Sequence, residues 1–103
     1  MIAGETGGVE MSQEQIRAQA VALMKDAWAQ VARQGDLVVP RNEAQVHEAV
    51  DLLRTSRADG DLLRTAEFLS CAMTQMRHYR RQGRINAYTS KLIRARKACD
   101  AMA

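Results

Sequence analysis

The sequence is poor in the residue types that most often build stacking surfaces, cross-links and chain breaks. Its 103 residues include only four aromatic side chains, two cysteines and one proline. So few aromatics give little support to a platform on which single-stranded nucleic acid would stack. No run approaches the roughly 18 apolar residues that a membrane span needs, and the first ten residues lack the features of a secretory signal. We therefore expect a cytoplasmic protein that makes no membrane contact.

Motifs for catalysis or metal binding are also missing, since the chain has no HExxH, CxxC, GxGxxG or phosphate-loop pattern. The nearest approach to such a site is a polar row on one predicted helix face, formed by Glu67, Cys71, Thr74 and His78. Cys71 and His78 lie seven residues apart, about 10.5 Å along a helix, so their thiol and imidazole cannot form a catalytic pair. The sequence predicts a protein that is not an enzyme and that holds no metal or cofactor.

The two cysteines, Cys71 and Cys99, fall at similar heights in two predicted helices that meet near residue 84. Cys71 nevertheless points about 180° away from the apolar stripe of its helix, as judged from regular helix geometry. A disulfide needs close and convergent Cβ atoms. The pattern therefore predicts two free thiols.

Acidic residues are absent from residues 68–99, and basic ones are abundant there. Residues 1–60 hold six basic and nine acidic side chains, a net charge of −3, whereas residues 61–103 hold nine basic and three acidic ones, a net charge of +6. We refer to the basic side chains of the acid-free stretch as the eight cations: Arg77, Arg80, Arg81, Arg84, Lys91, Arg94, Arg96 and Lys97. Charge segregated in this way predicts an electropositive face that attracts polyanions or acidic proteins.

A second interpretation of the eight cations is purely structural. Cations near the end of a helix are favoured by its dipole, and Arg77–Arg81 occupy such a position. Others would pair with carboxylates of the first two helices, including Glu43, Glu48 and Asp51. The sequence leaves both interpretations open.

Apolar residues recur at helical spacing along most of the chain. The spacing predicts helices near residues 12–34, 43–57, 61–82 and 86–102, which assemble into a single-domain antiparallel four-helix bundle. Residues 12–103 would form this all-α domain. Residues 1–11, with three glycines and two acids, are expected to be a disordered lead-in.

Local signals predict where the helices begin. Ser12–Gln15 is a capping-box pattern for the first helix. Asn42 and Asn86 are candidate N-caps for the second and fourth helices, with Ile85 placed to act as a hydrophobic staple. Residues 35–41 carry three consecutive apolar residues before a proline, which predicts a strap lying across the bundle.

The corner at residues 82–86 places a glycine between two helices, as a helix-turn-helix does. The apolar spacing around it does not fit that motif, because His78 and Thr89 fall where buried residues are required. The corner therefore favours an ordinary helical turn.

Two apolar side chains are candidate anchors for a partner. Trp28 lies at the edge of the predicted apolar stripe of its helix, and Ile93 stands alone on the basic side of the last helix.

The leading functional hypothesis is a small binding protein that docks the basic surface of its last two helices on a negatively charged partner, either nucleic acid or an acidic protein surface. The alternative is a protein–protein interaction module without a nucleic-acid role. Such a module would be a homodimer, or a small inhibitor of a host protein machine of the kind that phages and other mobile elements encode.

Overall fold

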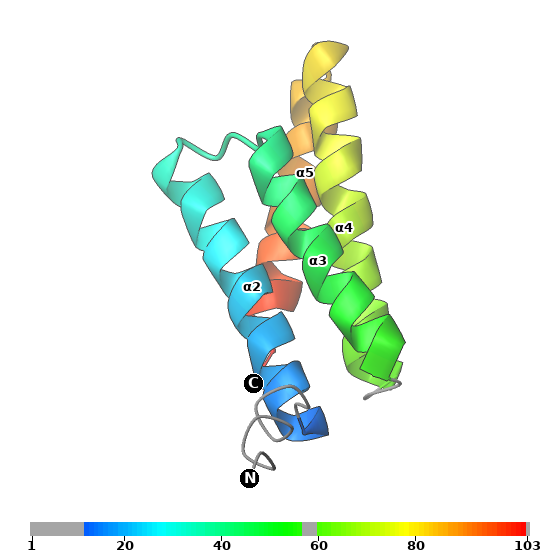
Figure 1. Ribbon diagram of the computed structural model, residues 1–103. Coiled ribbons are helices and arrows are strands. Elements are labelled where there is room, and N and C mark those ends of the chain that lie inside the picture. Colours follow the sequence, from blue (N-terminus) through cyan, green and yellow to red (C-terminus); the bar gives the residue numbers. More distant parts are fainter. Residues whose placement is uncertain (1–11, 57–59, 103) are drawn as a thin grey trace, which may run out of the picture.

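A computed structural model describes residues 12–56 and 60–102, and its ribbon is drawn in Figure 1. Within these residues the chain forms four α-helices and no strands. The helices are α2 (Gln13–Arg33), α3 (Pro40–Ser56), α4 (Gly60–Arg81) and α5 (Ile85–Asp100). The predicted all-α class is confirmed, and none of these helices has both the length and the apolar composition that a membrane crossing requires. The predicted lead-in of residues 1–11 lies outside the described residues.

Helices that follow one another in the chain are also neighbours in space. α2 packs on α3, α3 on α4 and α4 on α5, while α5 meets α2 more sparsely and closes the bundle. The colours of Figure 1 climb along α2 and α4 and descend along α3 and α5. The α2–α3 connection and the α4–α5 turn therefore lie at the same end, where the α4–α5 turn projects beyond the connection.

The core draws on every helix. Its largest apolar side chains without exposed surface are Met24, Leu53, Leu69, Met73 and Met76. Between them lie fully buried alanines, which allow the helices to approach closely. Methionine suits this role because its unbranched side chain adapts to irregular gaps.

The start of α2 follows the predicted capping box. The Ser12 Oγ accepts a hydrogen bond from the Gln15 N–H at 3.1 Å, and the Gln15 Oε1 accepts one from the Ser12 N–H at 2.9 Å. These reciprocal bonds satisfy two backbone donors that the helix itself leaves open.

The strap between α2 and α3 lies on the bundle, as the sequence predicts. Val38 is buried against the core, with 4% of its surface exposed. Gly35 and Asp36 both adopt positive φ, at 69° and 65°, which turns the chain sharply after α2. Glycine tolerates this conformation without cost, and aspartate tolerates it better than most residues.

Asn42 does not cap α3, contrary to the prediction, because the helix begins two residues earlier at Pro40. Proline suits the first helical position, where its missing N–H leaves no bond unmade. Asn42 is fully buried inside the helix. Its Oδ1 accepts from the Val39 N–H at 3.0 Å and from the Gln34 side chain at 3.1 Å. Its Nδ2 donates to the Gln30 side chain at 3.2 Å, so one amide ties the end of α2 to the start of α3.

The turn after α4 is built on Gly83, whose φ of 73° lies in the region that favours glycine. The Arg84 N–H donates to the Tyr79 carbonyl at 2.8 Å, and the Gly83 N–H donates to the Arg80 carbonyl at 3.1 Å. This pair of bonds is a Schellman motif, which satisfies the last carbonyls of α4.

The predicted start of the last helix is wrong in two respects. α5 begins at Ile85, so Asn86 lies within the helix and does not cap it, and Arg84 at the cap position makes no side-chain bond to the helix. Ile85 is 72% exposed and forms no hydrophobic staple. Asn86 cannot cap because the helix begins one residue before it, and Ile85 lies in a turn that projects beyond the α2–α3 connection (Figure 1).

Candidate functional site

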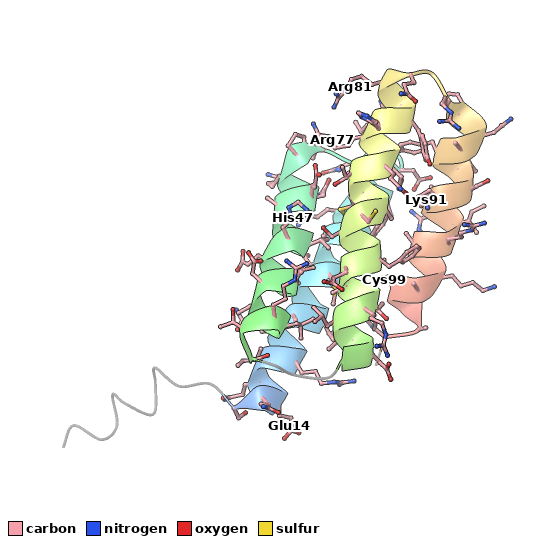
Figure 2. All side chains as sticks on the ribbon, turned by 90° about the vertical axis from the view of Figure 1, so that its right-hand side faces the viewer. Glu14, His47, Arg77, Arg81, Lys91 and Cys99 are labelled. Carbon is pink, nitrogen blue, oxygen red and sulfur yellow. The ribbon has the colours of Figure 1, made fainter. Side chains whose placement is uncertain are left out.

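The eight cations all lie on α4, on α5 or in the turn between them. Figure 2 shows Arg77 and Arg81 near the projecting end of α4 and Lys91 on α5, while Glu14 lies at the opposite end of the bundle. Their surroundings differ, because two cations face carboxylates, two lie over aromatic rings and the others lie at the exposed surface.

Arg77 is neutralised within the fold. Its Nη1 donates to the Glu43 Oε1 at 2.5 Å, and the Thr74 hydroxyl donates to the other oxygen of the same carboxylate. Burial raises the pKa of Glu43, but the hydrogen bonds from Thr74 and Arg77 and the charge of Arg77 outweigh it, so this pKa lies below its ordinary value. Glu43 therefore stays ionised at neutral pH and balances the charge of Arg77.

Arg96 is paired in the same way with the strap. Its Nη2 donates to the Asp36 Oδ1 at 2.7 Å. Beside this pair, the Tyr88 hydroxyl donates to the Asp36 carbonyl and accepts from the Val38 N–H at 3.3 Å. For Arg77 and Arg96 the structural interpretation holds, and neither side chain is available as a free cation.

The other six cations have no carboxylate partner among the residues that the structure describes. They are Arg80, Arg81, Arg84, Lys91, Arg94 and Lys97. Five of these six charges lie on α4 and α5, which pack against each other, and Arg84 lies in the turn between them.

Aromatic rings hold two of these six cations in place. The Arg84 guanidinium lies 4.8 Å from the centre of the Tyr79 ring, and the Lys91 ammonium lies 5.7 Å from the centre of the Phe68 ring. A cation–π contact attracts a cation but does not cancel its charge. Both rings are partly buried and each has a cation over it, so neither is presented as a free stacking surface.

Residues 80–86, which we call the tip, are exposed without exception. They include Arg80, Arg81 and Arg84, and they extend past the α2–α3 connection (Figure 1). The first turn of α5 begins here and contains no acidic residue. The positive end of its helix dipole therefore adds to the charge of the arginines.

The outward face of α5 continues the tip along the bundle. We define this face by its exposed side chains: Asn86, Thr89, Ser90, Ile93, Arg94 and Lys97. The stretch from the start of α5 to Lys97 is about 18 Å long at the usual helical rise. It carries no carboxylate until Asp100, at the other end of the helix.

A hollow of about 280 Å³ lies where the strap meets the end of α4. Leu37 and Val38 line it together with Arg77, Arg80 and Arg81. Two unpaired guanidinium groups thus share a concave site with one that is held by Glu43. Such an arrangement suits an oxyanion, because guanidinium groups match the geometry of phosphate and carboxylate oxygens.

The two predicted anchors differ in their exposure to solvent. Trp28 is only 4% exposed, so the prediction of a partly exposed anchor is wrong. The apolar stripe of α2 is wider than predicted, because α5 packs against α2 and covers the Trp28 indole. Ile93 is 61% exposed and lies on the outward face with Arg94 and Lys97, on the basic side of the last helix as predicted.

Both cysteines are free thiols, as the sequence predicts. Cys99 is buried, and this burial raises the pKa of its thiol. Cys71 is exposed and lines a hollow of about 480 Å³ between α3 and α4, together with Glu67, Thr74 and His47. Figure 2 shows His47 on α3 beside α4.

The polar row around Cys71 is engaged in bonds between helices. Glu67 pairs with Arg54 of α3 at 2.8 Å, and Thr74 donates to Glu43. Among residues 12–56 and 60–102, no group of three or more metal-ligating side chains lies together. These contacts give the row a role in joining α3 to α4.

Two features of the site escaped the sequence reasoning. The hollow below the tip is lined by the strap and by α4. No local sequence pattern predicts which part of α4 the strap will contact. Ile85 was assigned to packing, although its position directly after Gly83 and Arg84 placed it in the turn. The six polar or turn-forming residues around it, at positions 80–84 and 86, were the available signal.

The site carries no recognised signature. Comparison of the chain with protein-family models, with curated proteins and with solved structures gave no match. Its function is therefore argued from its own residues.

Proposed function

We propose that this chain is a small, non-enzymatic binding protein that docks the basic surface of α4 and α5 on a negatively charged partner, nucleic acid or an acidic protein surface. One observation carries the proposal: six of the eight cations have no carboxylate partner in the described part of the chain. Pairing with carboxylates explains Arg77 and Arg96 but none of these six, although the helix dipole favours Arg80, Arg81 and Lys97 in the last turns of α4 and α5.

The exposed cations divide the surface into a primary and a secondary part. The arginines of the tip, with Arg94 and Lys97, are exposed and form the primary contacts. Lys91 is half-buried over Phe68 and contributes mainly to the positive electrostatic field of the surface. Arg77 and Arg96 are balanced by carboxylates and serve to position the surface.

A surface of this kind binds with a strong salt dependence. Each phosphate contact releases counterions and contributes about −0.9 to the slope of log affinity against log salt. Five exposed cations give a slope of roughly −4.5, or roughly a 500-fold loss of affinity between about 50 and 200 mM salt.

The test measures fluorescence anisotropy with three labelled polyanions: a random-sequence duplex, a single strand and polyglutamate. We expect Arg80→Ala/Arg81→Ala to weaken binding roughly tenfold at low salt and to reduce the slope by about 1.8. The matched control, Lys25→Ala/Arg33→Ala, removes two exposed cations from α2 and leaves both quantities unchanged. Failure of all three polyanions to bind micromolar protein in low salt would overturn the proposal.

A second candidate function is protein–protein interaction, as a homodimer or with another protein. Ile85 and Ile93 are the large apolar side chains exposed on the described surface, and both belong to α5. Light scattering over a range of protein concentrations tests this candidate. A dimer that dissociates on Ile85→Ser/Ile93→Ser would support it, and a monomer at every concentration would exclude the homodimer.

The proposal includes the architecture that presents this surface. We propose a single-domain antiparallel four-helix bundle in the cytoplasm. The alternating direction of the helices in Figure 1 and the short turn at Gly83 support the antiparallel arrangement. One shared apolar core supports a single domain.

A further inference from the structure

We infer that the negatively charged partner is a nucleic acid duplex, and that the outward face of α5 and the tip lie against its phosphate backbone. This inference rests on the proposed function and narrows it to one class of partner.

The composition of the outward face fits phosphate contact. Asn86, Thr89 and Ser90 are small, exposed and neutral, and they lie between the arginines of the tip and the cations Arg94 and Lys97. Hydroxyl and amide side chains donate to phosphate oxygens as arginine and lysine do, and such contacts make up much of a protein–DNA interface. The outward face offers hydrogen-bond donors and no carboxylate over about 18 Å. It therefore suits nucleic acid, whose backbone presents phosphate oxygens as acceptors along its length.

The aromatic residues argue against a single strand. All four aromatic side chains of the chain are described. Trp28 is buried, Tyr88 bonds the strap, and the rings of Tyr79 and Phe68 lie under cations. Binding of single strands depends on rings that are free to stack on bases, and the basic surface presents none.

The apolar residues argue against an acidic protein as the main partner. Stable protein interfaces concentrate their energy in a desolvated centre of aromatic and aliphatic anchors. On the exposed surface of α5, Ile85 and Ile93 are separated by two helical turns with Thr89 between them. They do not form a contiguous apolar centre, so charge and hydrogen bonding must supply the affinity.

The shape of the surface also favours a duplex. A helix is stiff and holds its donors at fixed spacing, and a duplex holds its phosphates at fixed spacing too. The tip projects beyond the rest of the bundle (Figure 1), so a rigid rod can approach it without meeting the α2–α3 connection.

The decisive experiment places a charge at the centre of the outward face. Ile93→Glu introduces a carboxylate among the phosphates, whereas Ile93→Gln changes the side chain without charge. Ile93 is 61% exposed, and both replacements are good helix formers, so both variants should fold as the wild type does by circular dichroism. We expect Ile93→Gln to bind the labelled duplex within about threefold of wild type and Ile93→Glu to bind at least tenfold more weakly.

Comparison of the three probes separates this inference from the proposed function. A duplex that binds more tightly than the single strand and polyglutamate supports the inference. Equal or tighter binding of the single strand or of polyglutamate overturns it and leaves the proposed function standing. Equal duplex affinity of Ile93→Glu and Ile93→Gln also overturns it, because α5 would then not face the phosphates. If no probe binds, the proposed function itself fails.

Discussion

The α2–α3 half and the α4–α5 half of the bundle use their polar side chains in opposite ways. In the first half, Asn42 is buried and bonded on three sides, and Glu43 and Asp36 each hold an arginine of the other half. In the second half, Asn86 and most of the cations face water. These polar groups of the first half therefore stabilise the fold, while most cations of the second half make no ion pair within the described residues.

The largest expected effect comes from a matched pair of asparagines. Asn42→Ala should lower the free energy of unfolding by about 2–4 kcal/mol, because it leaves the Val39 N–H and two glutamine side chains without their partner. Asn86→Ala should change it by less than about 0.5 kcal/mol, because this exposed side chain makes no cap. Urea denaturation of the two variants measures both values. Equal losses would show that the two halves do not differ as described.

A smaller effect is expected at Glu43, where the two halves meet. Glu43→Gln should lower the free energy of unfolding by about 1–2 kcal/mol, because the acceptor of the bonds from Arg77 and Thr74 loses its negative charge. The same change releases the charge of Arg77, so the salt slope for duplex binding should steepen by about 0.9. An unchanged slope would show that Arg77 cannot reach the partner even when it is unpaired.

The pKa of Glu43 also gives this pair a pH signature. Because the folded carboxyl has a pKa below its ordinary value, its contribution to stability is complete above the unfolded value of about 4.3 and is lost as the pH falls toward the folded value. Wild-type stability should therefore fall more steeply below about pH 4.3 than that of Glu43→Gln. If the stability of the two proteins fell equally below this pH, the contact with Arg77 would not be what keeps Glu43 ionised.

The smallest effect is expected at Asp36. Asp36→Asn keeps a residue that tolerates positive φ and removes a half-exposed ion pair with Arg96. Stability should change by less than about 1 kcal/mol, while duplex affinity at low salt should rise by roughly threefold because one more cation is uncompensated. Thermal unfolding and anisotropy measure the two changes. Weaker binding would indicate that Arg96 positions α5 for its partner only while it is paired.

Local patterns in the sequence predicted the helices well. Apolar spacing located each helix, and Ser12, Gly35 and Gly83 marked ends that the structure keeps, because caps and glycine stops depend only on nearby residues. The two asparagine caps were wrong because each depends on context. α3 begins at Pro40, so Asn42 lies within the helix and in the core, and α5 begins at Ile85, so Asn86 lies within the helix and at the surface.

The candidate site was less predictable than the fold. The charge asymmetry located the cations on α4 and α5, but it did not reveal which of them are balanced by carboxylates. Arg77 and Arg96 meet carboxylates that lie 34 and 60 residues away in the chain. Such pairings are set by tertiary packing, as is the burial of Trp28 between α2 and α5.

The Tyr88 hydroxyl bonds backbone groups that lie 50 and 52 residues earlier in the chain. Closing so long a loop costs entropy that the local bonds of a helix do not incur. We therefore expect the helices to form early during folding and this tyrosine contact to close late. The orientation of the tip relative to α2 is then fixed in one of the last folding steps, by a phenolic oxygen and the neighbouring Arg96–Asp36 pair.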